Sequence, residues 1–337
     1  MAAAEGTLRI GMIGGGWVSR HHLTAWKRLA PRAEVVAIAD PDGEALSDRA
    51  AEFGIAATYP SAEALLAGEV ALDALDICAP RAFHAPLVRL AADRGLPAIC
   101  QKPLGVNLAE AEQLVADVGD RIRLMVHENW RFRAYYRRLA AWLREGVAGD
   151  IRQVRLAFLS SGMIADASGA RPALVRQPFL RGLERMLVSE ILIHHIDTLR
   201  FLLGDLDVRW AWLARSNGEI AGEDVATILF TRRSDGIPVT VTGSLAVHGE
   251  PPLPRDRLRI FGTDGTIDLD GSHLSANGRQ ALSQVFDADA AYQGAYDSVI
   301  AHFVECLKIG SAFETGPADN LKTLELVEAV YAANSNR

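Results

Sequence analysis

The sequence contains few of the residues that form disulfides, bind nucleic acids or enter membranes. Its 337 residues include three cysteines, Cys78, Cys100 and Cys306, which show neither C-x-x-C spacing nor a zinc-site pattern. The 35 Lys and Arg are scattered and outnumbered by 42 Asp and Glu, so the chain lacks the basic stripe that a phosphate backbone requires. No apolar run is long enough to cross a bilayer, and the first residues lack the features of a secretory signal. We therefore expect no metal, no nucleic-acid partner, no membrane partner and a cytoplasmic location.

The apolar content is high enough for two ordinary domains. Apolar residues make up 49% of the chain and charged residues 23%, which is the balance of a globular protein. A chain of 337 residues is longer than one typical core requires. We predict a first domain over residues 1–128 and a second over residues 129–337, whose last helix is able to pack back on the first domain.

In the first half of the chain, short apolar runs alternate with amphipathic stretches. The expected buried strands are Leu8–Ile13, Val35–Ala39, Ala74–Cys78, Ala98–Cys100 and Ile122–Val126. The expected helices between them are Ser19–Leu29, Glu44–Phe53, Ala82–Arg94 and Leu108–Val118. Strands that alternate with helices in this way form right-handed crossovers and a parallel sheet covered on both faces. The first domain is therefore predicted to be α/β, with a doubly wound parallel sheet of the Rossmann type.

In the second half of the chain the pattern changes, and apolar and polar side chains alternate along the expected strands. These strands are Ile151–Ser160, Val208–Ala214, Val225–Thr231, Val239–Leu245, Leu258–Phe261 and Thr266–Leu269. Alternation of this kind is typical of an antiparallel sheet with one exposed face. The expected helices are Leu187–Leu203, Ala290–Lys308 and Ala318–Ala333. We predict an α+β domain with a large, mostly antiparallel open sheet flanked by helices.

A glycine-rich loop follows the first predicted strand and opens the first predicted helix. Gly14 and Gly16 supply the first two glycines of a G-x-G-x-x-G pattern, and Ser19 stands in place of the third. The first glycine allows a tight turn, and the second lets backbone N–H groups approach a pyrophosphate at the helix N-terminus, beside Trp17 and Val18. A flexible turn would explain the glycines alone, but their place between strand and helix indicates a dinucleotide site.

An acidic residue, Asp40, ends the second predicted strand. A carboxylate at this place can accept hydrogen bonds from the adenosine ribose hydroxyls, and it would repel a 2′-phosphate. Asp42 adds negative charge and no arginine follows at once. The sequence therefore predicts NAD rather than NADP. A turn residue before Pro41 is the ordinary alternative, which the upstream glycines disfavour.

Five places in the chain, in their order and spacing, resemble the Gfo/Idh/MocA oxidoreductase family over essentially the whole length. They are the glycine loop with His22, Ala79-Pro80 with His84, Gln101-Lys102-Pro103, Asn129-Trp130-Arg131-Phe132, and Glu190 with His194 and Asp197. The resemblance implies hydride transfer between nicotinamide and a carbon that bears a hydroxyl, usually on a sugar or polyol. The cofactor-binding residues predicted in this way are Gly14, Gly16, Trp17, Val18, Asp40, Ala79, Pro80, His84, Gln101, Lys102, Asn129 and Arg131.

Lys102 corresponds to the family's catalytic cation, in a motif that is usually Glu-Lys-Pro. It follows a predicted strand directly, and ligands of open α/β sheets bind at the carboxyl ends of the strands. An ammonium there can donate a hydrogen bond to the substrate oxygen and stabilise the developing alkoxide. A solvated surface lysine is the ordinary alternative. Gln101 replaces the usual glutamate, which removes a negative charge beside the lysine and should lower the affinity of the lysine for a proton.

The family's second catalytic motif is Asp-x-x-x-His-x-x-Asp, which stands here as Glu190, His194 and Asp197. On a regular α-helix these positions share one face. Imidazole titrates near neutral pH, so His194 is the candidate general base, and Glu190 would orient it or bind a substrate hydroxyl. A helix face that only caps a neighbouring element is the alternative. The adjacent His195 is expected to pack.

Within the family, the Gln-Lys-Pro variant and the sequence around His194 resemble a subgroup that includes D-apiose dehydrogenases. This resemblance implies oxidation of an aldose such as D-apiose to its lactone, with a small carbohydrate or polyol as partner. The predicted substrate contacts are Lys102, Arg131, Glu190 and His194; for Arg131, an ion pair between domains is the alternative. Two other functions stay open: an enzyme that retains NAD while it eliminates from or cleaves a glycoside, and a non-catalytic NAD-binding regulatory protein. The open sheet predicts a homo-oligomer, either dimer or tetramer.

Overall fold

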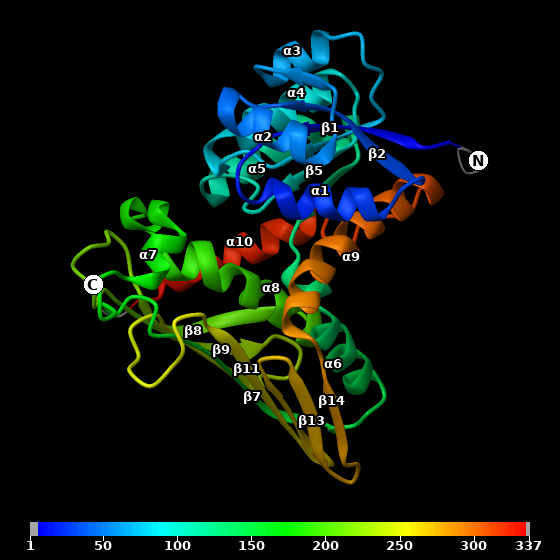
Figure 1. Cartoon of the computed structure of the whole chain (residues 1–337). Helices are drawn as coiled ribbons and strands as arrows, with labels where there is room; N and C mark the ends of the chain where they lie inside the picture. The colour runs from blue at the N-terminus through cyan, green and yellow to red at the C-terminus, as the bar shows by residue number, and fades with distance from the viewer. Residues whose placement is uncertain (1–5, 335–337) are drawn as a thin grey trace. The chain divides into compact units, whose positions relative to one another are not determined.

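The computed structural model describes residues 6–334, which divide by their contacts into two compact units (Figure 1). The first unit runs through Phe132 and includes Tyr292–Leu324. The second covers Arg133–Ala291 and continues from Glu325. The first unit is therefore built from two stretches that are far apart in the sequence.

The first unit contains, within the described residues, a six-stranded sheet in the order β3-β2-β1-β4-β5-β6. Its strands are β1 (Leu8–Ile13), β2 (Ala33–Ala39), β3 (Ala57–Tyr59), β4 (Ala74–Ile77), β5 (Ala98–Gln101) and β6 (Leu124–His127). Every neighbouring pair is parallel. Strands β4 and β6 are buried along their whole length, as expected for a sheet with helices on both faces. The predicted Rossmann-type fold class is confirmed.

Within residues 6–132 this unit contains five α-helices, three of which begin at a side chain that caps them. They are α1 (Ser19–Arg28), α2 (Gly43–Phe53), α3 (Ala62–Ala67), α4 (His84–Asp93) and α5 (Leu108–Val118), with short 3-10 turns at Arg81–Phe83, Gly119–Arg121 and Trp130–Phe132. The side chains of Asp42, Ser61 and Asn107 accept N–H groups at the starts of α2, α3 and α5. Gly54 ends α2 in the left-handed conformation, with φ of 72°.

A helix from late in the chain, α9 (Ala288–Ile309), completes the core of the first unit. From Tyr292 onward it packs beside α1, and its residues Val299, Ile300 and Phe303 are fully buried in one cluster with Trp26. His21 on α1 and Gln293 on α9 are joined twice, through the His21 ring and the His21 carbonyl. Strands β1 and β2 thus share a core with residues almost 300 positions later.

The second unit is organised around an eight-stranded sheet, counted within the described residues, in the order β14-β13-β12-β11-β7-β10-β9-β8. Its strands are β7 (Ile151–Leu159), β8 (Leu206–Ala214), β9 (Val225–Arg232), β10 (Pro238–Ser244), β11 (Arg255–Gly262), β12 (Gly265–Asp270), β13 (His273–Gly278) and β14 (Leu282–Val285). The pairs are antiparallel except for β7 with β10. Buried residues alternate with partly exposed ones along β9, so one face is open, and the predicted mostly antiparallel sheet is confirmed.

Helices cover the other face of this sheet (Figure 1). The helices of this unit are α6 (Ala134–Arg144), α7 (Pro172–Arg176) and α8 (Ile193–Leu203), with a 3-10 turn at Pro178–Gly182 and, from Glu325 onward, α10 (Pro317–Ala332). No helix within residues 6–334 combines the length and apolar character that a membrane span requires.

The predicted continuous α-helix over Leu187–Leu203 is wrong in its first part, because Leu187–Leu192 form a π-helix that leads into α8. The buried carboxylate of Glu223 caps the start of this π-helix, because it accepts the N–H groups of Met186 (3.3 Å) and Val188 (3.0 Å). The Tyr331 hydroxyl donates to Glu223 Oε1 (2.6 Å) and accepts from the Ser189 N–H. Burial and the Glu223 carboxylate raise the pKa of Tyr331 well above its usual value, so the hydroxyl remains a donor.

Candidate active site

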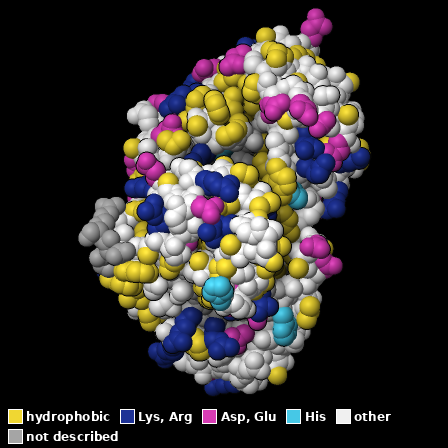
Figure 2. All heavy atoms as spheres, turned by 60° about the vertical axis from the view of Figure 1, so that its left-hand side comes forward, with side chains coloured by type: hydrophobic (Ala, Val, Ile, Leu, Met, Phe, Trp, Pro, Cys, Tyr) yellow, Lys and Arg dark blue, Asp and Glu magenta, His cyan; other side chains and the backbone are white. Residues whose placement is uncertain are grey.

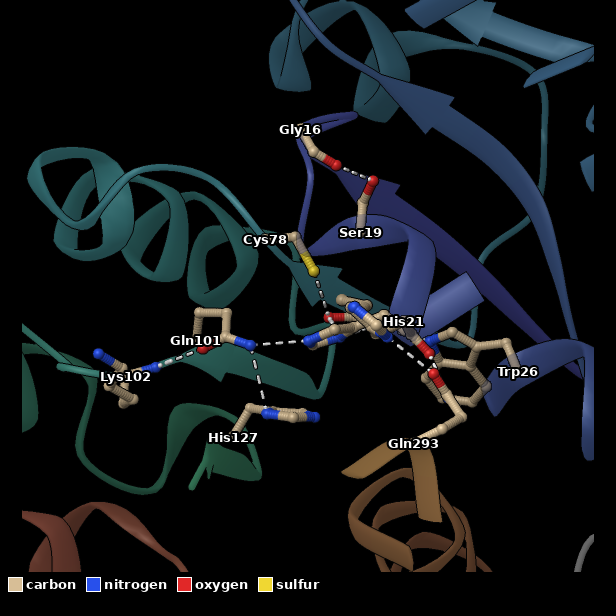
Figure 3. Close-up of polar contacts among 11 residues, drawn as sticks. Gly16, Ser19, His21, Trp26, Cys78, Gln101, Lys102, His127 and Gln293 are labelled. Carbon is tan, nitrogen blue, oxygen red and sulfur yellow. Dashed lines mark hydrogen bonds and ion pairs between the residues drawn. The ribbon is translucent and has the colours of Figure 1, made fainter. Parts of the chain in front are cut away.

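The glycine loop is shaped by a close approach of β1 to the end of β4. Gly14 has φ of 104°, and a Cβ there would lie 2.8 Å from the carbonyl of Cys78, so only glycine fits. A Cβ at Gly16 would meet no atom within 4 Å, so its backbone is open to a ligand. The Ser19 hydroxyl donates to the Gly16 carbonyl at 2.6 Å and closes the loop (Figure 3). Trp17 is 63% exposed beside it. The loop can hold a pyrophosphate as the sequence predicts.

Asp40 lies beside this loop and is held by backbone donors. Its Oδ2 accepts the N–H of Gly15 at 2.6 Å, and its Oδ1 accepts the N–H of Asp42 at 2.7 Å. Both oxygens keep a second lone pair for a ligand hydroxyl. The loop and this carboxylate together fit the diphosphate and the ribose of NAD.

We expect Asp40→Ser to shift the ratio of kcat/KM for NAD to that for NADP by roughly tenfold or more towards NADP. A tenfold change corresponds to about 1.4 kcal/mol, which is small beside the repulsion of two close negative charges. The measurement is steady-state kinetics with each cofactor. Asp48→Ser, on the exposed side of α2, is the matched control. An unchanged ratio would show that Asp40 does not select the cofactor.

His84 ties together the segments that follow β4 and β5. It is buried, and its ring nitrogens lie 2.7 Å from the Pro103 carbonyl oxygen and 2.8 Å from the Ala79 carbonyl oxygen. These contacts fix the backbone on both sides of Lys102 and at Ala79-Pro80. His84 thus has a clear positioning role, whereas its predicted contact with the cofactor stays a prediction.

Gln101 is the last residue of β5 and precedes Lys102 directly. Its side chain contacts the Lys102 backbone N–H, the His22 ring and the His127 ring (Figure 3). His22 in turn contacts the fully buried carboxylate of Asp76. Sequence reasoning missed Asp76 and His127. A carboxylate within the apolar run Ala74–Cys78 was the available signal, because a buried charge requires a partner.

Asn129 and Arg131 follow β6 and are both buried. A guanidinium nitrogen of Arg131 lies 2.7 Å from Asp319 Oδ2, and another lies 3.9 Å from Glu314 Oε1. All three residues belong to the first unit, so this ion pair is within a unit. The predicted contacts of Asn129 and Arg131 with cofactor or substrate stay predictions.

In the second unit, His194 and Asp197 lie on α8 and are buried, His194 with 9% exposure. Glu190 is partly buried and lies in the preceding π-helix. The expectation that all three share one face assumed 3.6 residues per turn, and the wider π turn breaks that assumption for Glu190. His194 and Asp197, three positions apart within α8, retain it. Their catalytic roles stay predictions.

His195 is fully buried and packs away from solvent. Its Nε2 lies 2.8 Å from Asp256 Oδ1, and its ring lies against Phe158. Asp256 also accepts from Tyr136 (2.9 Å) and lies 3.5 Å from Arg133. Burial acts to raise the pKa of Asp256, but His195, Arg133 and Tyr136 outweigh it and hold the pKa well below its usual value. Asp256 is therefore a charged group in the interior of the second unit.

One group among the described residues has donor atoms close enough for a metal ion, namely His22, Asp76 and Cys78. Asp76 already accepts from His22, from Trp26 at 2.7 Å and from the Cys78 thiol at 3.5 Å. Burial raises the pKa of Cys78 well above its usual value, and so does Asp76, which keeps the sulfur protonated. The group therefore fits a hydrogen-bond network better than a metal site.

Charged side chains of both signs are scattered over the face shown in Figure 2. Basic residues there are interspersed with acidic ones, without the continuous stripe that nucleic-acid binding requires.

The chain matches two family descriptions in sequence order. Residues 8–126 match "Oxidoreductase family, NAD-binding Rossmann fold", and residues 136–268 match "GFO/IDH/MocA C-terminal domain".

Individual relatives match nearly the whole chain. The D-apiose dehydrogenase of Paraburkholderia graminis is 36% identical over 333 residues, which cover 95% of this chain and 86% of that protein. The D-apiose dehydrogenase of Rhizobium rhizogenes is 33% identical over 341 residues, with coverage of 98% and 96%. A solved oxidoreductase from Agrobacterium radiobacter, in complex with NAD+, L-tartaric acid and magnesium, superposes with a TM-score of 0.88 at 33% identity, with coverage of 98% and 96%.

Proposed function

The chain belongs to the Gfo/Idh/MocA oxidoreductase family, and on that premise we propose that it oxidises the anomeric carbon of an aldose such as D-apiose to the lactone. It is an NAD-dependent oxidoreductase that acts on a sugar CH–OH group. The observation that carries the substrate is the 36% identity to a D-apiose dehydrogenase over 95% of the chain. A second such relative at 33% identity supports the same choice.

The chemistry removes a hydride and a proton from the substrate carbinol. NAD, when bound at the loop of Gly14 and Gly16, supplies the hydride acceptor. Lys102 donates a hydrogen bond to the substrate oxygen and stabilises the negative charge that develops on it. We assign the proton to His194, or to Lys102 reacting as the neutral amine, from which it passes to solvent. In this proposal Glu190 orients His194 or binds a substrate hydroxyl. Arg131 contacts the substrate.

A homo-oligomer is part of this proposal. The open face of the second sheet carries Trp210 and Trp212 on its edge strand β8, 42% and 37% exposed. A sheet face with large apolar side chains is buried well by a second copy of the chain. A molar mass of one chain in solution would reject this part. The three cysteines are free and buried, which suits the cytoplasmic location that we also propose.

The test is nicotinamide absorbance after the protein is mixed with NAD and a panel of aldoses, polyols and glycosides. We expect reduction of NAD with apiose and weaker reduction with other aldoses. Reduction with another sugar but not with apiose would overturn the substrate assignment. Tight binding of NAD without net reduction by any carbinol would overturn the dehydrogenase assignment, and a glycoside consumed under those conditions would identify an enzyme that retains its cofactor.

A further inference from the structure

A buried polar cluster lies next to Lys102 in the first unit, and it is centred on Gln101. Its other members are His22, Asp76 and His127, which are at most 1% exposed. The cluster joins α1, β4, β5 and β6, because each contributes one member. We name it the Gln101 cluster. Gln101 and Lys102 are adjacent in the chain, so contacts that hold Gln101 also hold the backbone of Lys102.

The orientation of the Gln101 amide is decided by a backbone group. The Lys102 N–H can only donate, and it lies 3.2 Å from Gln101 Oε1. The amide nitrogen of Gln101 must therefore face the two rings, 2.7 Å from His22 Nε2 and 3.3 Å from His127 Nδ1. Since that nitrogen donates both hydrogens, each ring nitrogen must be an acceptor without a proton.

The proton of His22 is consequently on Nδ1. This nitrogen lies 2.9 Å and 3.1 Å from the two oxygens of Asp76, which can only accept when charged. Trp26 Nε1 donates to the same carboxylate at 2.7 Å. His22 is therefore a neutral imidazole between a charged carboxylate and a neutral amide. A second proton would have to be placed on Nε2, against the Gln101 N–H.

We propose that Gln101 is a positioning residue that holds the backbone of Lys102 and keeps His22 neutral, so that the Gln101 cluster does not change charge near neutral pH. This proposal depends on the proposed function only for the role of Lys102. The His22 and His127 rings stack with centroids 4.0 Å apart, which further opposes two imidazolium ions. The titratable or charged groups that face His22 or Asp76 are Cys78, Cys100, His127, Tyr296 and, through Gln101, Lys102.

A glutamate at position 101 would reverse the direction of the hydrogen bonds between this side chain and the two rings. Its carboxylate has no hydrogen to donate, yet it would face the same two ring nitrogens. His22 Nε2 would then have to carry a proton, and His22 would become an imidazolium ion between two carboxylates. The substitution would thus add one negative charge at position 101 and one proton on His22, next to Lys102.

The first test is histidine nitrogen NMR on the full chain, with and without NAD, which requires no substrate. In the natural protein we expect His22 to be neutral with its proton on Nδ1 throughout about pH 5–8, where free imidazole changes charge. In Gln101→Glu we expect His22 to be doubly protonated over that range. His22→Asn identifies the His22 signals by their loss. Gln284→Glu, exposed on β14, adds the same charge elsewhere and should leave His22 unchanged.

A His22 ring that titrates in the natural protein would overturn the proposal even if no variant folds. Identical His22 signals in the natural protein and Gln101→Glu would also overturn it. The second readout is the pH dependence of kcat, in which Gln101→Glu should show one more ionisation than the natural protein, outside about pH 5–8, and Gln284→Glu none. Failure of sugar oxidation would reject the proposed function and leave the NMR result to decide this inference.

Discussion

We expect Lys102→Met to lower kcat/KM for sugar oxidation by about 10²–10³-fold, and further if Lys102 also carries the proton, while NAD still binds. Loss of one donor to a developing oxyanion typically costs about that much. Methionine keeps the length of the chain and removes the charge. The Lys102 backbone N–H, which contacts Gln101, is unaffected by the substitution. Steady-state kinetics with sugar and an NAD titration by tryptophan fluorescence measure the two quantities separately.

The control is Lys27→Met, in the last turn of α1 and exposed, which removes one positive charge from the same unit. Its turnover should match that of the natural protein. Near-normal activity of Lys102→Met would remove Lys102 from the mechanism. Loss of NAD binding would assign it to the cofactor instead.

We expect Asp256→Ala to lower the free energy of unfolding by about 3–5 kcal/mol, the usual cost of breaking a buried ion pair by removing one partner. The substitution leaves Arg133 and His195 without their carboxylate, and Tyr136 without its acceptor. These residues lie on β11, α8 and at or near the start of α6, so three elements lose a common anchor. Urea denaturation followed by circular dichroism gives the measurement.

The same residue makes stability depend on pH. The pKa of Asp256 is lowered in the folded protein, so its stabilising effect is fully present above its unfolded pKa of about 3.9 and is lost as the pH falls below it. Asp256→Ala should therefore lose less stability on acidification below about pH 4 than the natural protein does.

Asp270→Ala is the matched control, because Asp270 is more than half exposed on the neighbouring strand β12 and pairs with Arg255 and Arg257, which are both partly exposed. Exposed pairs contribute about 0–1 kcal/mol. Equal destabilisation by Asp256→Ala and Asp270→Ala would show that the buried network contributes little.

The parallel sheet could be predicted because its strands are continuous apolar runs separated by helices of ordinary length. Ala57–Tyr59 and Ala62–Ala67 were not predicted, since three and six residues are too few to show a period. The strand His273–Gly278 was missed because only Leu274 and Ala276 are buried along it. The π-helix at Leu187–Leu192 could not be foreseen, because the Glu223 carboxylate that caps its start lies more than 30 positions later.

In the candidate site, too, local patterns could be predicted and long-range contacts could not. Gly14, Gly16 and Asp40 could be predicted as cofactor contacts because a short local pattern specifies a loop and the end of a strand. The contacts of His22 with Asp76 and with Gln101 span 54 and 79 positions. The apolar run around Asp76 signals that this carboxylate needs a partner, but not which residue it is, because these pairings arise only when β4 and β5 align in the sheet.

The return of α9 to the first unit has a consequence for biosynthesis. A ribosome releases residues 8–126 long before Val299, Ile300 and Phe303, yet these residues fill the same core as Ile10, Met12 and Trp26. The core of the first unit is therefore incomplete until α9 has been synthesised. Until then its apolar side chains stay exposed to solvent and to chaperones. A chain truncated anywhere before α9 would lack part of the core of the first unit, so the defect would lie among the residues that are made first.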